Sequence, residues 1–120
     1  MTALAPAVAE ALSHSQTIDM TTIGRTSGAP RRIEIMLHSI DGRLLISGHP
    51  GRPRSWIANL NADPHITLHL RRPPADVEGR ARVITDHAER ERLLAPIAQA
   101  WRIPLPVMVD ASPLIEVTPD

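Results

Sequence analysis

The chain has 120 residues, 42% of them hydrophobic, with thirteen basic and thirteen acidic side chains. This length predicts one domain over residues 1–120 that can bury a core. Cysteine is absent, which excludes disulfides, thiolate metal sites and thiol catalysis. Zero net charge argues against a broad attraction to nucleic acids or membranes.

The beginning of the chain predicts a short helix or arm over residues 1–15. Residues 4–14 are rich in alanine, and they lack the basic start and uninterrupted apolar core of a signal peptide. No apolar stretch approaches the about 20 residues that span a bilayer. We therefore expect a cytoplasmic protein whose barrel domain occupies residues 16–118.

Alternating apolar and polar residues then predict three strands. The period of two is found over residues 18–21, 31–38 and 43–47. Asp41-Gly42, between the second and third runs, is a typical hairpin turn. The Gly- and Pro-rich residues 47–54 predict a loop after the third strand.

The middle of the chain predicts a helix and a second hairpin. Ser55 can cap a helix that ends near Asp63, because Pro64 disfavours helical geometry before it. Residues 65–71 and 77–85 read as two more strands joined by the sequence RRPPAD.

The last third predicts one helix and a final strand. Asp86 and Glu89 form a capping-box-like pair at the start of a helix that Pro96 should kink or divide. Residues 113–119 read as the last strand. Six short strands with two or three helices predict a small antiparallel β-barrel rather than a parallel sheet.

The turn over residues 24–31 is unusual because three arginines surround it: Arg25, Arg31 and Arg32. Guanidinium groups so close together repel one another unless they bind an anion or pair with carboxylates. Solvation, or pairing with Asp19 and Glu34, is the ordinary explanation of surface charge. The alternative is a clamp for phosphate or carboxylate that also uses backbone N–H groups of Gly24 and Gly28.

The loop over residues 47–54 also favours an anionic ligand. Its small residues let a ligand approach the backbone, and the helix that follows offers unpaired N–H groups and a positive dipole end. Arg52 and Arg54 add charge there. The loop matches neither a Walker loop nor a Rossmann fingerprint.

Structural roles explain most of the histidines and tryptophans. His65 and His69 lie on a strand, about 13 Å apart at about 3.3 Å per residue, so we expect paired or solvated histidines and no metal site. His38 is expected to be a polar residue facing outward. Trp56 is either core or a platform for a flat ring system, and Trp101 is expected to be core.

Two ordered motifs carry a family resemblance. G-R-x-[ST]-G-x-P-R at residues 24–31, followed by W-x-x-N-L-x-A-x-P at residues 56–64, resembles the deazaflavin-dependent nitroreductase family. These flavin/deazaflavin oxidoreductases have an FMN-binding-like split β-barrel and are found mainly in actinobacteria. The likeness runs from about Ile18 to Thr85. It implies binding of reduced coenzyme F420 and hydride transfer to quinones, nitro compounds or activated alkenes.

The resemblance also implies a set of cofactor-binding residues. Those that match the family are Arg25 and Arg31 at the cofactor tail, Ser47, Gly48 and His49 under the phosphate, and Met36, Trp56 and Asn59 near the ring. Charge and location add Arg32, Arg52 and Arg54. No catalytic residue is assigned, because the chemistry would belong to the cofactor.

Departures from the family keep other interpretations open. The chain has neither tyrosine nor lysine, whereas family members use tyrosines around the substrate and commonly a lysine in the phosphate loop. FMN binding, as in the pyridoxamine-phosphate-oxidase branch, is one alternative, and a non-catalytic carrier of an anionic ligand is another. Zero net charge and few aromatics disfavour a nucleic-acid-binding barrel. Pairing of two copies through a sheet edge and the identity of the substrate stay open.

Overall fold

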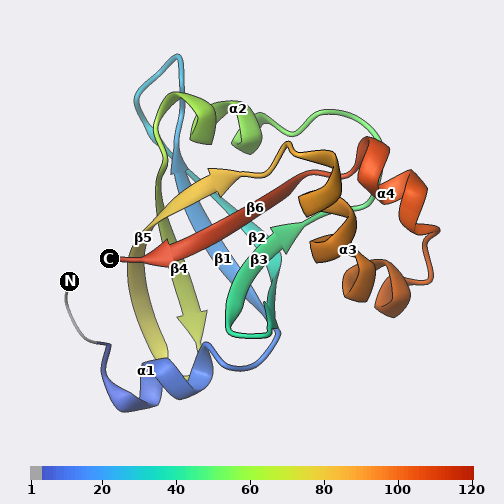
Figure 1. Cartoon of the computed structure of the whole chain (residues 1–120). Helices are drawn as coiled ribbons and strands as arrows, with labels where there is room; N and C mark the ends of the chain where they lie inside the picture. Colours follow the sequence, from blue (N-terminus) through green and yellow to red (C-terminus); the bar gives the residue numbers. More distant parts are fainter. Residues whose placement is uncertain (1–3) are drawn as a thin grey trace.

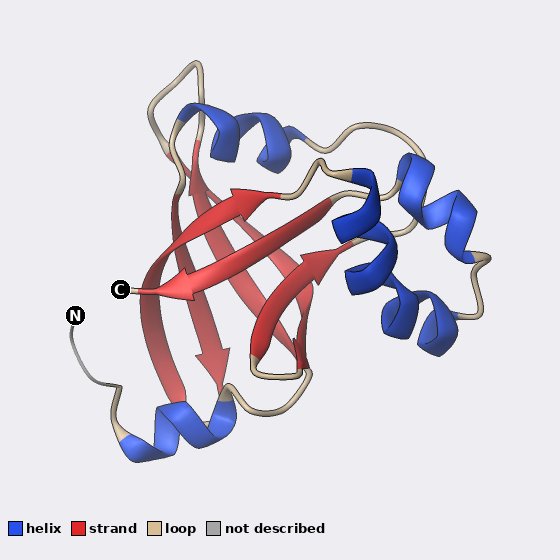
Figure 2. Cartoon of the chain, in the orientation of Figure 1, coloured by secondary structure: helices blue, strands red, loops and turns tan. Residues whose placement is uncertain are grey.

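The computed structural model describes residues 4–120 as a closed antiparallel barrel with four helices (Figures 1 and 2). The strands follow the order β1-β2-β3-β6-β5-β4 around the barrel. In chain order the elements are α1 (Pro6–Ala11), β1 (Gln16–Ile23), β2 (Pro30–Ile40), β3 (Arg43–Ser47), α2 (Ser55–Ala62), β4 (His65–Arg71), β5 (Pro74–Val83), α3 (His87–Trp101), α4 (Leu105–Ala111) and β6 (Leu114–Pro119). The predicted antiparallel barrel is confirmed.

The strands form where the sequence alternates, because every second side chain enters the barrel. Ile18, Met20 and Thr22 of β1 are buried, while the residues between them are only partly covered. β1 pairs with β2 over its whole length, from Gln16↔Leu37 to Ile23↔Pro30. The residues between them therefore form the tip of one long hairpin.

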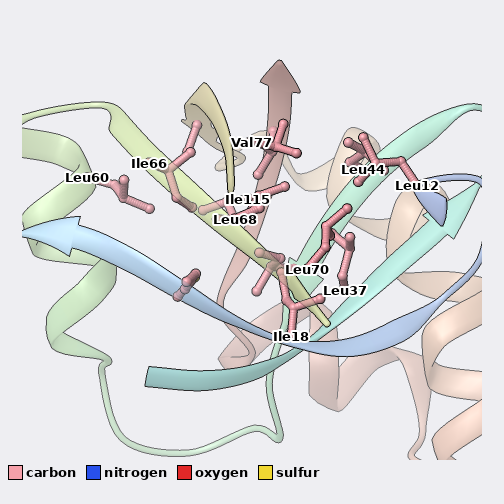
Figure 3. Packing of buried hydrophobic residues seen from close by; sticks show 14 of the residues in the cluster. Leu12, Ile18, Leu37, Leu44, Leu60, Ile66, Leu68, Leu70, Val77 and Ile115 are labelled. Atoms are coloured by element: carbon pink, nitrogen blue, oxygen red, sulfur yellow. The ribbon is translucent and has the colours of Figure 1, made fainter. Parts of the chain in front are cut away.

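Two hydrophobic clusters share the wall formed by β3 and β6. Side chains from all six strands fill the barrel interior (Figure 3). Leu12, which follows α1, and Trp56 and Leu60 of α2 complete this cluster. A second cluster lies between the outside of this wall and α3 and α4, and it includes Leu45, Leu94 and Leu114. β3 and β6 are therefore buried on both faces, which ties the two helices to the barrel.

Several helix predictions need correction. α1 is shorter than the 4–14 segment, and residues 1–3 lie outside the described part of the chain. Ser55 is the first residue of α2 rather than its cap; Arg54 occupies the cap position. The Asp86 side chain does accept a hydrogen bond from the Glu89 N–H group, at 2.9 Å. Pro96 does not divide α3, which continues past it as one helix to Trp101.

Two elements differ from the expected pattern at prolines. β5 begins at Pro74, so the connection after β4 is shorter than RRPPAD. α4 was not anticipated, since its prolines read as loop; they lie at its start, where a missing N–H group costs little. Among residues 4–120, no helix is long and apolar enough to cross a membrane.

Candidate functional site

The turn between β1 and β2 is closed by its own backbone. The Gly24 N–H group donates to the Ala29 carbonyl at 2.9 Å, and the Gly28 N–H group donates to the Gly24 carbonyl at 2.8 Å. The expectation that these two groups are free to bind an anion is therefore wrong. A Cβ at Gly24 would lie 2.6 Å from the Ser27 Oγ atom, so only glycine fits there without a shift.

Helix α2 holds this turn through Asn59. The Asn59 Oδ1 atom accepts from the Arg25 N–H group at 3.1 Å, and the Asn59 amide donates to the Thr22 hydroxyl at 3.3 Å. Asn59 is 5% exposed, so it supports the turn from the buried side and presents little surface to a ligand.

The three arginines of the turn have different partners. Arg32 donates to the Asp19 carboxylate at 2.9 Å, as the ordinary explanation expected. Arg71 of β4 joins the same group by bonding both Asp19 and Glu34. The hydrogen bond from Arg32, followed by that from Arg71, lowers the pKa of Asp19.

Arg25 and Arg31 differ from Arg32 because both keep their charge available. They are exposed, and neither guanidinium forms an ion pair with a carboxylate of residues 4–120. Exposed guanidinium forks on a turn with a fixed backbone match the geometry of carboxylate and phosphate groups. These two arginines are therefore able to receive an anion.

The loop after β3 is braced from two sides. The buried Ser47 hydroxyl donates to the Pro113 carbonyl at 2.6 Å, and the Gly51 N–H group donates to the Ala111 carbonyl at 3.2 Å. The Arg54 guanidinium donates across the loop to the carbonyls of His49, at 2.6 Å, and Arg52, at 2.9 Å. The loop is thus held in one shape without help from a ligand.

An aromatic contact fixes the outer side of the same loop. The His49 ring stacks on Trp101 at the end of α3, with a centroid distance of 4.9 Å and an interplanar angle of 20°. No side chain of residues 4–120 caps α2, so the first N–H groups of this helix also face the end of the loop without a side-chain acceptor.

Trp56 belongs to the core. It is 7% exposed and lies in the barrel cluster. Of its two interpretations, the structure favours packing: Trp56 holds α2 over the barrel opening. Trp101, in contrast, is only partly buried and serves as the surface on which the loop rests.

The outer side of β2 carries Met36 and His38. Met36 is half-buried, and its sulfur lies 3.9 Å from the Thr17 hydroxyl. His38 is buried against the edge of Trp101, with ring centroids 5.2 Å apart, so the expectation of an outward polar residue is wrong. Its Nε2 atom has no hydrogen-bond partner among the described residues. Burial lowers the pKa of the His38 imidazole.

The remaining strand histidines are paired, as expected. His65 contacts the Glu78 carboxylate at 2.8 Å. His69 lies between the Thr21 hydroxyl and the Asp76 carboxylate, 2.7 Å from each. The sequence did not reveal this Thr21–His69–Asp76 chain, because its members come from three different strands. It lies on the outside of the barrel and has the geometry of a cross-strand polar ladder.

The predicted site residues therefore divide among several places. Arg25, Arg31 and Asn59 meet at the turn, and Ser47, Gly48 and His49 form the braced loop. Arg52 and Arg54 also line a groove between α2 and α4. Met36 lies on the outer side of β2, Arg32 is paired with Asp19, and Trp56 is buried.

Comparison with known families identifies the group of proteins to which this barrel is related. A family model described as F420H2-dependent quinone reductase matches residues 3–103, which include the turn, the braced loop and α2. The chain belongs to this family. Membership in the F420H2-dependent quinone reductases confirms the resemblance to deazaflavin-dependent reductases and indicates an oxidoreductase. The search of curated proteins gives no match.

Solved structures support the fold of this F420H2-dependent reductase family member. A conserved hypothetical protein from Mycobacterium tuberculosis aligns with a TM-score of 0.74 at 17% identity, covering 98% of this chain and 81% of the other. An F420-H2-dependent reductase aligns at 0.62 and 21% identity, covering 85% and 93%. A putative pyridoxamine 5'-phosphate oxidase from Listeria innocua aligns at 0.68 and 15% identity, covering 94% and 90%. At these identities the likeness establishes the split-barrel fold alone.

Proposed function

We propose that this protein transfers a hydride from reduced coenzyme F420 to a small organic acceptor such as a quinone, a nitro compound or an activated alkene. Bound deazaflavin supplies the hydride chemistry. The observation that carries the proposal is the presence of two arginines, Arg25 and Arg31, without carboxylate partners in residues 4–120, on a turn that matches the family motif.

The role of the turn is to bind the anionic tail of the cofactor. Its backbone hydrogen bonds and the Asn59 contact hold the backbone of Arg25 in place before any ligand arrives. A preorganised site loses less conformational freedom on binding, so more of the charge-assisted hydrogen-bond energy is retained. We assign the same role to Arg31, the second residue of β2, which lies beside Gly24.

The role of the braced loop is to support the phosphate. The side chains of Ser47 and Arg54 donate their hydrogen bonds to backbone carbonyls of the protein, so they fix the shape of the loop around Gly48 and His49. The uncapped start of α2 adds N–H donors and a positive dipole end. Met36 is the residue of β2 that we assign to the ring, whereas Trp56 holds α2 from inside the barrel.

Titration with coenzyme F420 tests the proposal. Arg31→Ala should weaken binding by about tenfold to a hundredfold, because a hydrogen bond to a charged group contributes about 1.5–3 kcal/mol. Arg92→Ala, which removes an exposed arginine from α3, is the matched control and should bind like the wild type. Oxidation of reduced F420 in the presence of a naphthoquinone then tests the hydride transfer itself.

The competing functions give different results in the same assays. A wild type that binds FMN and not the deazaflavin would support an FMN-dependent protein. Tight binding of F420 without reduction of any acceptor would support a carrier. Equal losses of affinity in Arg31→Ala and Arg92→Ala would contradict the assignment of the tail to the turn.

A further inference from the structure

A large groove lies on the side of α2 that faces α4. Its volume is about 1210 Å³, more than the about 300–1,000 Å³ of ordinary ligand pockets. Figure 1 shows α2 and α4 at the same end of the barrel, with the 47–54 loop running between them. Arg52 and Arg54 line the groove, whereas Arg25, Arg31 and Met36 do not. It is therefore a different place from the turn and the outer side of β2.

The walls of this groove are mainly apolar. Ile57 of α2 lies on one side and Val107 and Val109 of α4 lie on the other, with Ile84 between them. Val107 is 45% exposed, and it is one of only two large hydrophobic residues in the described part of the chain that are exposed; Ile33 is the second. An exposed aliphatic side chain beside an apolar cavity favours a ligand with an apolar body.

The charge of the groove is predominantly positive. Three arginines line it, Arg52, Arg54 and Arg90, against two carboxylates, Glu91 and Asp110. Glu91 lies 3.6 Å from His87, which also lines the groove. None of the three arginines forms an ion pair within residues 4–120. An apolar ligand that carries one negative charge therefore complements the groove better than a neutral or cationic one.

Arg90 makes this charge permanent. Its guanidinium donates to four backbone carbonyls, those of Ile84, Met108, Val109 and Ser112, at 2.5–3.2 Å. These neutral acceptors satisfy its donors without cancelling its charge. Burial lowers the pKa of Arg90, but an arginine stays protonated at neutral pH. The groove therefore has a fixed cation in its lining.

We propose that the groove between α2 and α4 binds a small organic anion with an aromatic or other apolar ring system. The rings would contact Ile57, Val107 and Val109, and the acidic group would lie toward Arg52. This site uses neither the turn nor the outer side of β2, although it shares Arg52 and Arg54 with the loop assigned to the cofactor.

Two fluorescent probes of the same ring system test the proposal without any deazaflavin present. One is 1-anilinonaphthalene-8-sulfonate, an anion, and the other is the neutral N-phenyl-1-naphthylamine. We expect saturable binding of both, with the anion binding more tightly. Added salt should weaken the binding of the anionic probe only, because ions in solution screen the attraction between charges. Arg52→Gln should lower the affinity for the anion several-fold and leave that for the neutral probe unchanged.

A pair of matched variants locates the binding. Val107→Asp should lower the affinity for the anionic probe at least about tenfold, because it removes an apolar contact and adds a repelling charge. Ile33→Asp places the same charge at the other exposed aliphatic residue and should change nothing. Both positions are exposed, so circular dichroism should report an unchanged fold for both variants.

Several outcomes would overturn the assignment. These are equal losses in the two Asp variants, equal affinities of the two probes, or no saturable binding to the wild type. A dimer in light scattering that Val107→Asp converts to a monomer would show that a second copy covers the groove. Arg31 does not line the groove, so the titration of Arg31→Ala with coenzyme F420 tests the proposed function separately.

Discussion

At the scale of single residues, the arginines show that one side-chain type takes several roles in this chain. Arg32 pairs with Asp19, Arg54 bonds loop carbonyls, and Arg90 bonds four carbonyls of the C-terminal part. The motif predicted which arginines surround the turn. The ordinary explanation of surface charge included the pairing with Asp19 that Arg32 makes, but not Arg71, which completes that group and lies 52 residues from Asp19 in the sequence.

Asn59 provides a test of how the turn is held. Asn59→Ala removes the acceptor of the Arg25 N–H group and the donor to Thr22 in a buried position. We expect the free energy of unfolding to fall by about 1–3 kcal/mol, the cost of leaving buried groups unpaired. Asn61→Ala, at an exposed position of the same helix, should change it by less than about 0.5 kcal/mol. Urea denaturation of both variants is the measurement, and equal effects would contradict this role.

His38 predicts a specific dependence of stability on pH. Its pKa in the folded protein is lowered below the ordinary 6.5, because burial disfavours the charged imidazolium. As pH falls below about 6.5, the unfolded chain binds a proton at His38 that the folded chain binds only at a lower pH. Stability due to neutral His38 is therefore present above pH 6.5 and is lost toward the folded pKa.

His38→Phe keeps an aromatic ring against Trp101 and removes the titration. The loss of unfolding free energy between pH 7 and about pH 5 should be smaller in this variant than in the wild type. His87→Asn, on the exposed side of α3, is the control and should lose as much as the wild type does. A His38→Phe protein with the same pH slope as the wild type would contradict the interpretation.

At the scale of elements, the sequence predicted the strands but not the packing of α3 and α4 against the outside of the barrel. The period of two located β1 to β5 to within a few residues, because half of each strand must enter the barrel. Residues 113–119 were also predicted as the last strand, which is β6. α4 was missed since Pro104 and Pro106 resemble a loop, although prolines suit a first helical turn. Without α3 and α4 packed outside β3 and β6, His38 could not be expected to be buried.

Arg90 provides the test at this scale, because it links α3 to α4 and to Ser112, which follows α4. Arg90→Met leaves the carbonyls of Val109 and Ser112 without their side-chain donor, whereas that of Met108 keeps the Ser112 N–H group. The free energy of unfolding should fall by about 3 kcal/mol, a value typical of broken hydrogen bonds to a charged group. Arg92→Met, exposed on the same helix, should have almost no effect. Equal midpoints for the two variants in urea would show that the clamp contributes nothing.

At the scale of the whole molecule, the order of the motifs predicted the barrel and the family but not how the predicted site residues divide among several places. The motif W-x-x-N places Trp56 and Asn59 on one helical face, and that face turns inward to the barrel. Arg52 and Arg54 lie in the groove, because the loop from β3 to α2 passes beside α4, where the Gly51 N–H group donates to the Ala111 carbonyl. Such placements depend on contacts between β3, α2 and the C-terminal segment, which no local pattern records.

The two hydrophobic clusters should unfold as one unit, because β3 and β6 belong to both of them. Leu45 faces the outer cluster and Ile46 faces the barrel interior, so separating either cluster exposes the same strands. The two tryptophans report on them separately: Trp56 lies inside the barrel and Trp101 packs against the outer cluster. Trp101→Phe therefore leaves Trp56 as the fluorescent reporter of the barrel interior, and Trp56→Phe leaves Trp101 as the reporter of the outer cluster.

In each single-tryptophan protein, the urea transition followed by fluorescence should coincide with that followed by far-ultraviolet circular dichroism. Leu94→Ala, fully buried in the outer cluster, should lower the free energy of unfolding by about 2–5 kcal/mol in both proteins. It should do so without changing the dependence on urea, since the same surface is exposed on unfolding. Val107→Ala, exposed on α4, should leave both midpoints nearly unchanged. A Trp101 transition at lower urea than the circular dichroism change would show instead that α3 and α4 detach first, leaving the barrel to unfold alone.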